Sequence, residues 1–274
     1  MSILDGLAVE KQISVLVVRL VTATHTTPAH TVFGMRLKHS FRTVIKWLAI
    51  ALALLLAAYA CWAGTMWYRY GHVTPPSADN SDQQLDRFMP VYEVAKRGGL
   101  RVQAPAETTF STACALNLTD SPVAKAIFRT RALVLGGDWK PGAPPPQGLV
   151  KQVTSWGWAL LAEVPGREFV FGTATQPWLA NPVFRSIPPA EFAAFHEPGY
   201  VKIIWMLRAD PIDAASSMAR TETRVATTDP VARAKFRRYW AWTSPGIMSI
   251  RLVLLTQLRA EAERYARQAV SAKH

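Results

Sequence analysis

The sequence predicts an α+β fold, in which an antiparallel sheet is covered by a long C-terminal helix and preceded by one transmembrane helix. Three observations carry this prediction. An apolar run occupies residues 44–67, alternating apolar residues mark strands in the second half, and a helical pattern closes the chain after residue 229. Strands collected between helices, without regular strand–helix alternation, are typical of helices that cover one face of an antiparallel sheet.

The apolar run, VIKWLAIALALLLAAYACWAGTMW, begins at Val44 and ends at Trp67. It carries one charge, Lys46, and a helix of roughly 20 apolar residues crosses a bilayer. We therefore expect a transmembrane helix over residues 44–68. Basic residues precede it, and only Arg69 follows closely. The positive-inside rule then predicts a single-pass protein of the cell membrane, with a cytoplasmic N-terminus and an extracytoplasmic C-terminal domain.

A cleaved signal peptide is the alternative for the same run. Read from Met35, the sequence has a basic start, an apolar middle and a small-x-small end at Ala58 and Ala60. Apolar residues continue to Trp67, beyond such a cleavage point, which favours an uncleaved anchor. The domain leaves the cytoplasm in both cases. Because Met35 directly precedes the basic flank of the apolar run, translation could also start there instead of at Met1.

The chain is expected to have four parts. Residues 1–43 are a cytoplasmic, poorly ordered segment, followed by the transmembrane helix. Residues 69–90 are polar, contain proline and lack an apolar period, so they are expected to be a linker. Residues 91–270 form the outer domain.

The outer domain opens with a strand or hairpin pair over residues 91–105 and a short helix after Pro105. A second helix follows, for which Asp120 or Ser121 is a suitable N-cap, and then a proline-rich loop over residues 138–148. Two strands are expected next, joined by the Pro-Gly turn at residues 165–166. In the first of these, alternation puts Trp156, Trp158 and Leu160 on one face.

A second hairpin is expected from YVKIIWMLRAD and SSMARTETRVATT, joined by PIDAA. Asp229 followed by Pro230 is a helix start signal, which Ser244 and Pro245 repeat. The sequence therefore predicts a long C-terminal helix that is broken between Trp242 and Gly246.

Catalytic and metal-binding motifs are absent from the sequence. Cys61 and Cys114 have no metal-ligand spacing and are not expected to pair. No nucleophile elbow, phosphate loop or zinc-protease motif is present. We expect no cofactor, no metal and no catalytic constellation.

Charge is distributed unevenly, with nine basic and two acidic residues in 230–274 out of 31 and 19 in the whole chain. This basic helical surface faces solvent or lipid. Nucleic acid is not an expected partner, because the domain lies outside the cytoplasm and no nucleic-acid motif is present.

Candidate ligand contacts are the tryptophans that could line a cavity, two charges of the TETR stretch and an aromatic pair on the last helix. Each has a structural alternative, since the aromatics could fill the core and the charges could pair across the outside of the sheet. The oligomeric state stays open. The candidate residues are Trp156, Trp158, Trp178, Trp205, Glu222, Arg224, Tyr239 and Trp240.

Several stretches resemble the START-like superfamily, also called SRPBCC, which has a helix-grip fold. These are LRVQAPAETTFSTACAL, LAEVPGREFVFG, FHEPGYVKIIWMLRA and TETRVATTDPVARAKFRRYW. They are similar to bacterial members of unassigned function, some of them membrane-anchored. The resemblance covers residues 91–268 and implies an apolar cavity between the sheet and the last helix.

The expected function is therefore that of a membrane-anchored, extracytoplasmic domain that binds a hydrophobic or lipid-like ligand. An enzyme is the less favoured outcome. It would be a cyclase or hydrolase of the same fold that uses Glu222 or His196. A protein-interaction module with a filled cavity is the third possibility. The fold alone does not separate the three.

Overall fold

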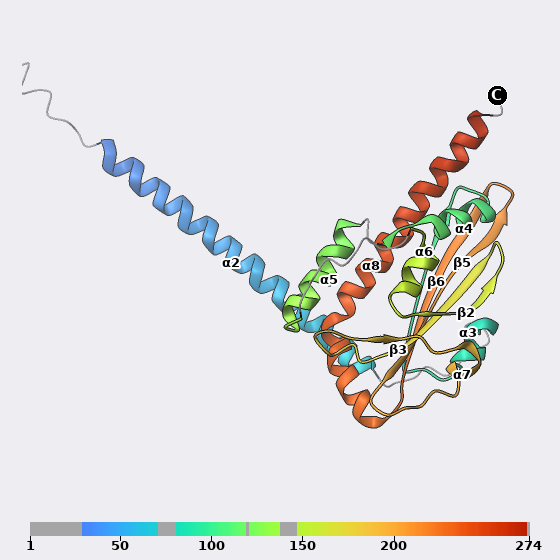
Figure 1. Ribbon diagram of the computed structural model, residues 1–274. Coiled ribbons are helices and arrows are strands. Elements are labelled where there is room, and N and C mark those ends of the chain that lie inside the picture. The colour runs from blue at the N-terminus through green and yellow to red at the C-terminus, as the bar shows by residue number, and fades with distance from the viewer. Residues whose placement is uncertain (1–28, 71–80, 119–120, 138–146, 273–274) are drawn as a thin grey trace, which may run out of the picture. The chain divides into compact units, whose positions relative to one another are not determined.

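The computed structural model describes residues 29–70, 81–118, 121–137 and 147–272. Contacts divide the chain into two units, Met1–Ala60 and Cys61–His274. Each unit is described by itself, and Figure 1 identifies their helices and strands.

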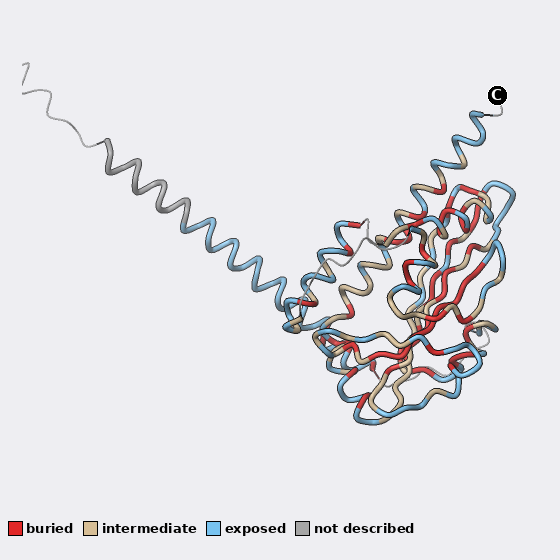
Figure 2. The backbone as a smooth tube through the Cα atoms, viewed as in Figure 1, coloured by how far each residue is buried: buried red, intermediate tan, exposed pale blue. Residues whose placement is uncertain are grey.

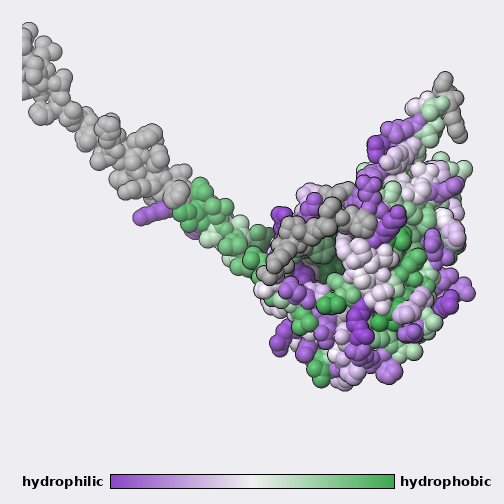
Figure 3. Space-filling model, viewed as in Figure 1, coloured by the Kyte–Doolittle hydropathy of each residue, from purple (hydrophilic) through white to green (hydrophobic). Residues whose placement is uncertain are grey.

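Helix α2, Ala29–Arg69, is continuous and begins well before the expected Val44. Residues 1–28 of the expected N-terminal segment lie outside the described residues. On length and composition, Arg42–Arg69 is the one described helix able to cross a membrane. Its apolar side chains, including Trp47, Leu54 and Leu55, are exposed and appear as a mostly apolar surface in Figure 3.

A six-stranded antiparallel sheet is the centre of the second unit, in the order β1-β6-β5-β3-β2, with β4 paired to β3. The sheet and the long C-terminal helix confirm the predicted α+β class and are consistent with a helix grip. Residues 94–102 form one strand instead of a hairpin pair, because the whole stretch pairs with β6 through Gly98 and Gly99. The strands are β1 Val94–Val102, β2 Ala159–Val164, β3 Glu168–Thr175, β4 Phe184–Arg185, β5 Val201–Asp213 and β6 Ser216–Thr227.

Helices cover the two faces of the sheet unequally. We call the face toward α8, Pro230–Ser271, the inner face, and it is also covered by α4, Ala106–Ala115, and α6, Leu149–Ser155. Helix α5, Pro122–Val134, packs against α8. The short helices α3, Gln83–Phe88, and α7, Pro189–Phe192, pack on the opposite, outer face.

Helix α8 starts as predicted, with the Asp229 carboxylate accepting hydrogen bonds from the amides of Val231 and Ala232. The predicted break is wrong, because the helix continues through Pro245 to Ser271. Ser244 lies inside this helix, and its hydroxyl accepts a hydrogen bond from the Trp62 indole at 3.1 Å. A proline inside a helix bends it without ending it, and Figure 1 shows α8 changing direction in its first half.

The last turns of α2 belong to the second unit. Met66 and Tyr70 are buried against Phe236 and Trp240 of α8. The Arg237 guanidinium lies 4.3 Å from the centroid of the Trp67 ring and donates to the Trp67 carbonyl. These contacts make the end of α2 part of the domain core.

Part of the expected linker, residues 69–90, also packs on the domain. Residues 71–80 lie outside the described residues, whereas 83–88 form α3 with Asp82 as its N-cap. Leu85 and Phe88 are buried on the outer face of the sheet. Two acids of this segment, Asp82 and Asp86, pair with Arg208 and Arg224 on that face.

The two tryptophans expected on a strand lie before it instead, so that expectation is wrong. Trp156 ends α6 and Trp158 precedes β2, which starts at Ala159. Gly157 between them has a φ of +90°, a left-handed conformation that interrupts an extended strand.

Buried residues form three clusters. One lies on the inner face under α4, α6 and α8, around Phe169, Leu207 and Leu258. Another lies where α2 meets the start of α8, around Phe236 and Val201. The outer face carries the third, around Leu85 and Ile204. Figure 2 shows the buried positions concentrated in the sheet.

Candidate functional site

One line of side chains crosses the whole sheet on its inner face. Register pairs Lys96 of β1 with Thr223 of β6, Thr223 with Trp205 of β5, Trp205 with Phe171 of β3, and Phe171 with Leu160 of β2. Directly opposed residues point to the same face of a sheet. These five residues, which we call the transverse row, change from basic through polar to aromatic and aliphatic.

The transverse row is less covered than its neighbours. Four of its five side chains are only partly buried, and Phe171 alone is fully buried. In the next row toward α4, Thr221, Leu207 and Phe169 are each 1% exposed. The row therefore lies where the inner face is incompletely covered, at the edge of the cluster around Phe169.

Helix α8 faces the basic end of the row with Arg251. Its guanidinium donates to the Thr223 hydroxyl at 3.0 Å. Its stem passes β1 so closely that a Cβ on Gly98 would lie 3.2 Å from the Arg251 Cδ. The glycine thus lets the arginine lie against the sheet, beside Lys96.

Three positive charges gather at this end of the row. Burial lowers the pKa of the Lys96 ammonium, and the charges of Arg69 and Arg251 lower it further. Burial also lowers the pKa of Arg251, opposed by the charge of Glu222. Among the described residues, no carboxylate forms an ion pair with Lys96, Arg69 or Arg251.

Trp205 is the sequence-predicted residue that lies in the row. Its ring stacks on Phe171 at 5.7 Å and its indole donates to the Thr221 hydroxyl at 2.8 Å. Trp156 and Trp158 are partly buried against the same cluster as Trp205. The structure thus brings three of the four predicted tryptophans to one part of the core.

The remaining predicted aromatics lie at the other inner cluster. Trp178 and Tyr239 are partly buried there, and Trp240 is 4% exposed and packed on Phe236. Lys235 lies over the Trp178 ring at 5.9 Å. These three aromatics therefore pack where α8 meets the end of α2.

Glu222 and Arg224 lie on the outer face, away from the tryptophans. The buried Arg224 guanidinium binds Glu222 at 2.8 Å and Asp86 of α3 at 2.5 Å, and it lies 4.6 Å from the Tyr92 ring centroid. Arg97 binds the second oxygen of Glu222 at 2.8 Å. Glu222 and Arg224 therefore pair on the outside of the sheet, as the structural alternative expected. They are buried beneath α3 instead of exposed to solvent.

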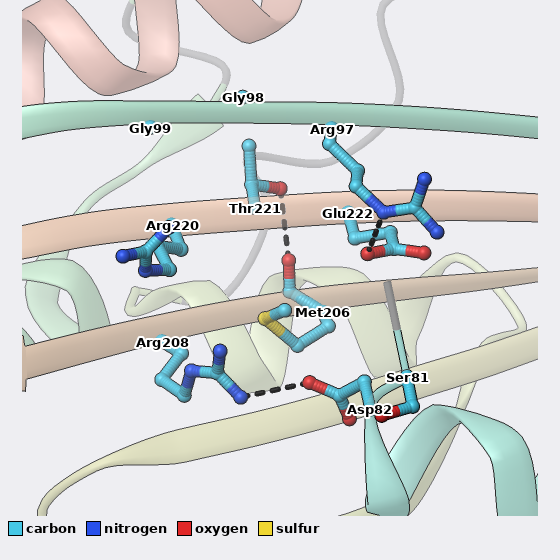
Figure 4. A pocket seen from close by; sticks show the side chains of 10 residues that line it. All are labelled: Ser81, Asp82, Arg97, Gly98, Gly99, Met206, Arg208, Arg220, Thr221 and Glu222. Carbon is cyan, nitrogen blue, oxygen red and sulfur yellow. Dashed lines mark hydrogen bonds and ion pairs between the residues drawn. The ribbon is translucent and has the colours of Figure 1, made fainter. Parts of the chain in front are cut away.

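A pocket of about 320 Å³ opens on the outer face beside this network. Figure 4 shows Arg97 directed toward Glu222 and Arg208 toward Asp82, so the charges at its wall largely neutralise one another. The pocket is a polar surface between α3 and the sheet. Its lining residues are Ser81, Asp82, Arg97, Gly98, Gly99, Met206, Arg208, Arg220, Thr221 and Glu222.

Glu168 lies next to the same network. Its Oε1 atom is buried without a hydrogen-bond partner among the described residues, and Oε2 lies 3.6 Å from Arg208. Burial raises the pKa of this carboxyl, and the charge of Asp82 raises it further. The outer face therefore holds acids and bases in contact with each other and with α3.

Comparison with known proteins finds distant structural similarity. No protein-family model matches the sequence, and none of the curated proteins matches it. A conserved protein from Geobacillus kaustophilus aligns over 62% of this chain and 96% of its own, at 10% identity and a TM-score of 0.30.

Two enzymes align similarly. A norcoclaurine synthase from Thalictrum flavum covers 61% of this chain and 94% of its own, at 12% identity and a TM-score of 0.29. An aromatase/cyclase from Streptomyces sp. R1128 covers 64% and 97%, at 16% identity and 0.24. Similarity this distant identifies no activity, so function is argued below from the residues of this chain.

Lys96 and Arg251 are not among the residues predicted from the sequence. A signal for Lys96 exists, because strand alternation puts it on the same face as Val94, Leu100 and Val102. A lysine among inward-facing apolar positions is unusual and calls for an explanation. Arg251 has no such signal, since its role depends on the rotation of α8 over the sheet.

Replacing Arg224 tests the outer network. Arg224→Met leaves Asp86 and one oxygen of the buried Glu222 without their arginine partner, and we expect a loss of about 3 kcal/mol in the free energy of unfolding. The control is Arg220→Met, on the same strand and face, whose side chain is 51% exposed. It should cost less than about 1 kcal/mol. Chemical denaturation of the full chain in mild detergent measures both, and equal losses would contradict the network's importance.

Replacing Lys96 tests the uncompensated charge. Because the folded pKa of Lys96 is lowered, the unfolded state binds more protons, and the wild type gains stability as pH rises from that pKa toward the ordinary lysine value. We expect Lys96→Met to be more stable by about 1 kcal/mol near neutral pH, with an advantage that shrinks as pH rises.

The exposed Lys151 supplies the control for this substitution. Lys151→Met should change stability by less than about 0.5 kcal/mol. Denaturation curves for the three proteins at several pH values make the comparison. A Lys96→Met variant that is less stable than the wild type at neutral pH would show that the lysine has a stabilising partner.

Proposed function

We propose that the second unit binds a hydrophobic, lipid-like molecule on the inner face of its sheet, along the transverse row. The incomplete covering of this row carries the proposal. Trp205 and Leu160 are partly exposed at the edge of the cluster around Phe169, although the next row toward α4 is fully covered. An apolar ligand would complete the covering of Trp205 and Leu160.

The outer pocket and the transverse row differ in the charge and polarity of their side chains. The acids that line the outer pocket are paired with arginines, and α3 is held there by the same pairs. The transverse row offers an aromatic surface with stacked rings, which suits apolar and flat groups. The inner face is therefore the better candidate for an apolar ligand.

An enzyme of the cyclase or hydrolase type is the second candidate, favoured by the polar groups Lys96, Thr223 and Arg251 at one end of the row. The acid and base considered from sequence do not join them. Glu222 lies on the outer face, and the exposed His196 ring contacts the Ala194 carbonyl in the segment after α7. Neither Glu222 nor His196 therefore lies in the row, and we favour binding over catalysis.

Native mass spectrometry of the full chain, released from detergent, tests the binding proposal. We expect the wild type to carry a co-purified apolar molecule. Trp205→Ala should lower its occupancy at least about tenfold, because burying an aromatic ring contributes a few kcal/mol. Trp242→Ala, which removes a tryptophan that is 56% exposed on α8, should keep the ligand. A folded wild type that never carries such a molecule would refute the proposal.

We further propose that α2 anchors the protein in the cell membrane as a single pass, with the N-terminus in the cytoplasm and the domain outside. The support is the length and apolarity of Arg42–Arg69 and the basic residues before it. The packing of residues 63–70 on α8 is compatible with an uncleaved anchor and with a chain cleaved before Cys61.

Reporter fusions and intact mass test the anchoring. Alkaline phosphatase fused to the C-terminus in a bacterial host should be active, since it folds only outside the cytoplasm, and a green fluorescent protein fusion should be dark. The mass of the membrane-extracted protein should include residues N-terminal to Cys61. Fluorescence of the green fluorescent protein fusion, with an inactive phosphatase fusion, would show the opposite orientation. A mass equal to that of a chain beginning at Cys61 would show cleavage.

A further inference from the structure

We infer that the ligand of the transverse row is an amphipathic anion, whose carboxylate or phosphate headgroup is bound by Lys96 and Arg251 and whose apolar part lies against the partly exposed Trp205 and Leu160. This inference rests on the proposed function and names the chemical class of its ligand. It depends on the order of residue types along the row, which is set by strand register.

The headgroup end is defined by contacts from two elements. Arg251 reaches from α8 to the Thr223 hydroxyl, and Thr223 lies directly opposite Lys96 in the sheet. The two cations therefore converge on one point of the inner face. An ammonium and a guanidinium at one point can together satisfy the oxygens of a single carboxylate or phosphate.

Lys96 and Arg251 are partly removed from solvent and have no carboxylate counterion among the described residues. This end of the row is therefore suited to a negatively charged group. Both cations are partly buried, and each has its pKa lowered by burial. The acid that acts on Arg251 is Glu222, which is held on the outer face by Arg97 and Arg224. A partly buried cation without a partner costs folding free energy, which a bound anion would offset.

The apolar end of the row begins at Trp205 on β5, two strands away from Lys96 on β1. Trp205 and Phe171 stack at 5.7 Å, and Leu160 continues the row on β2. Neighbouring strands lie about 4.8 Å apart, so the five strands of the row extend over roughly 19 Å. That length suits a headgroup with a chain of about ten carbons or a compact ring system.

Binding of ligands that share a chain length but differ in headgroup measures the contributions of the headgroup and the apolar part separately. The full chain in nanodiscs of neutral phosphatidylcholine is titrated with decanoate, decyl phosphate, 1-decanol and inorganic phosphate, and empty nanodiscs are subtracted. We expect decanoate or decyl phosphate to bind at least about tenfold more tightly than decanol, because hydrogen bonds to charged groups are the strong ones. Inorganic phosphate should bind weakly, because it lacks the apolar part.

Variants assign the effect to the two cations. Lys96→Met and Arg251→Met should each weaken binding of the anionic ligand about tenfold and leave decanol binding unchanged. Arg251→Lys keeps the charge and should retain part of the affinity, which guards against a folding defect. Arg259→Met, two turns further along α8 and paired with Glu263, is the matched control and should bind like the wild type.

The outcomes distinguish the inference from the proposed function. Equal binding of decanoate, decyl phosphate and decanol would overturn the anion site and leave the hydrophobic site in place. Inorganic phosphate binding as tightly as decyl phosphate would overturn the amphiphile in favour of a free anion. Failure of all four ligands to bind the folded wild type would overturn both. Selective loss of anion binding in Lys96→Met and Arg251→Met would support the inference.

Discussion

The alternation of side chains along β6 is the constraint on which the two faces of this domain depend. Glu222 and Arg224 point outward and Thr221, Thr223 and Val225 point inward, because successive residues of a strand face opposite sides. Arg224 is fully buried, and its pairs with Glu222 and Asp86 hold α3 on the outer face. Alternation thus places the charged Glu222 and Arg224 on the outer face and the hydroxyls of Thr221 and Thr223 on the inner face, where the site lies.

The inner face is organised by how far α8 reaches across it. Helix α8 contacts β1, β6 and β5, whereas α4 packs over β5 and β6 and α6 packs over β2. The transverse row runs across the sheet beneath these helices, and all of its side chains except Phe171 stay partly exposed. Its basic end meets Arg251 of α8 and its apolar end meets the stacked rings. A ligand lying along the row would therefore contact α8 through its polar part and the sheet through its apolar part.

Sequence patterns gave the fold class, the strands β3, β5 and β6, and both start signals of the helices at Ser121 and Asp229, because each depends on local periodicity or capping. The burial of α3 could not be predicted, since its polar residues are satisfied by partners far along the chain, such as Arg224 and Arg208. The continuity of α8 through Pro245 is likewise accompanied by a contact from far along the chain, the Trp62–Ser244 hydrogen bond. In the site, Trp205 was predictable as an inward aromatic, but the meeting of Lys96 and Arg251 is a tertiary contact.

The basic end of the row also meets the last turn of α2. Arg69 lies close enough to Lys96 for its charge to lower the pKa of that lysine, and Tyr70 is buried beside Phe236. Under the proposed anchoring, the turns of α2 that pack on α8 follow the membrane span directly, so Arg69 lies close to the depth of the bilayer headgroups. Amphipathic anions in a membrane concentrate at that same depth. The packing of α2 on α8 would therefore hold the cationic end of the site near the source of such molecules, which a flexible tether ending at residue 90 would not do.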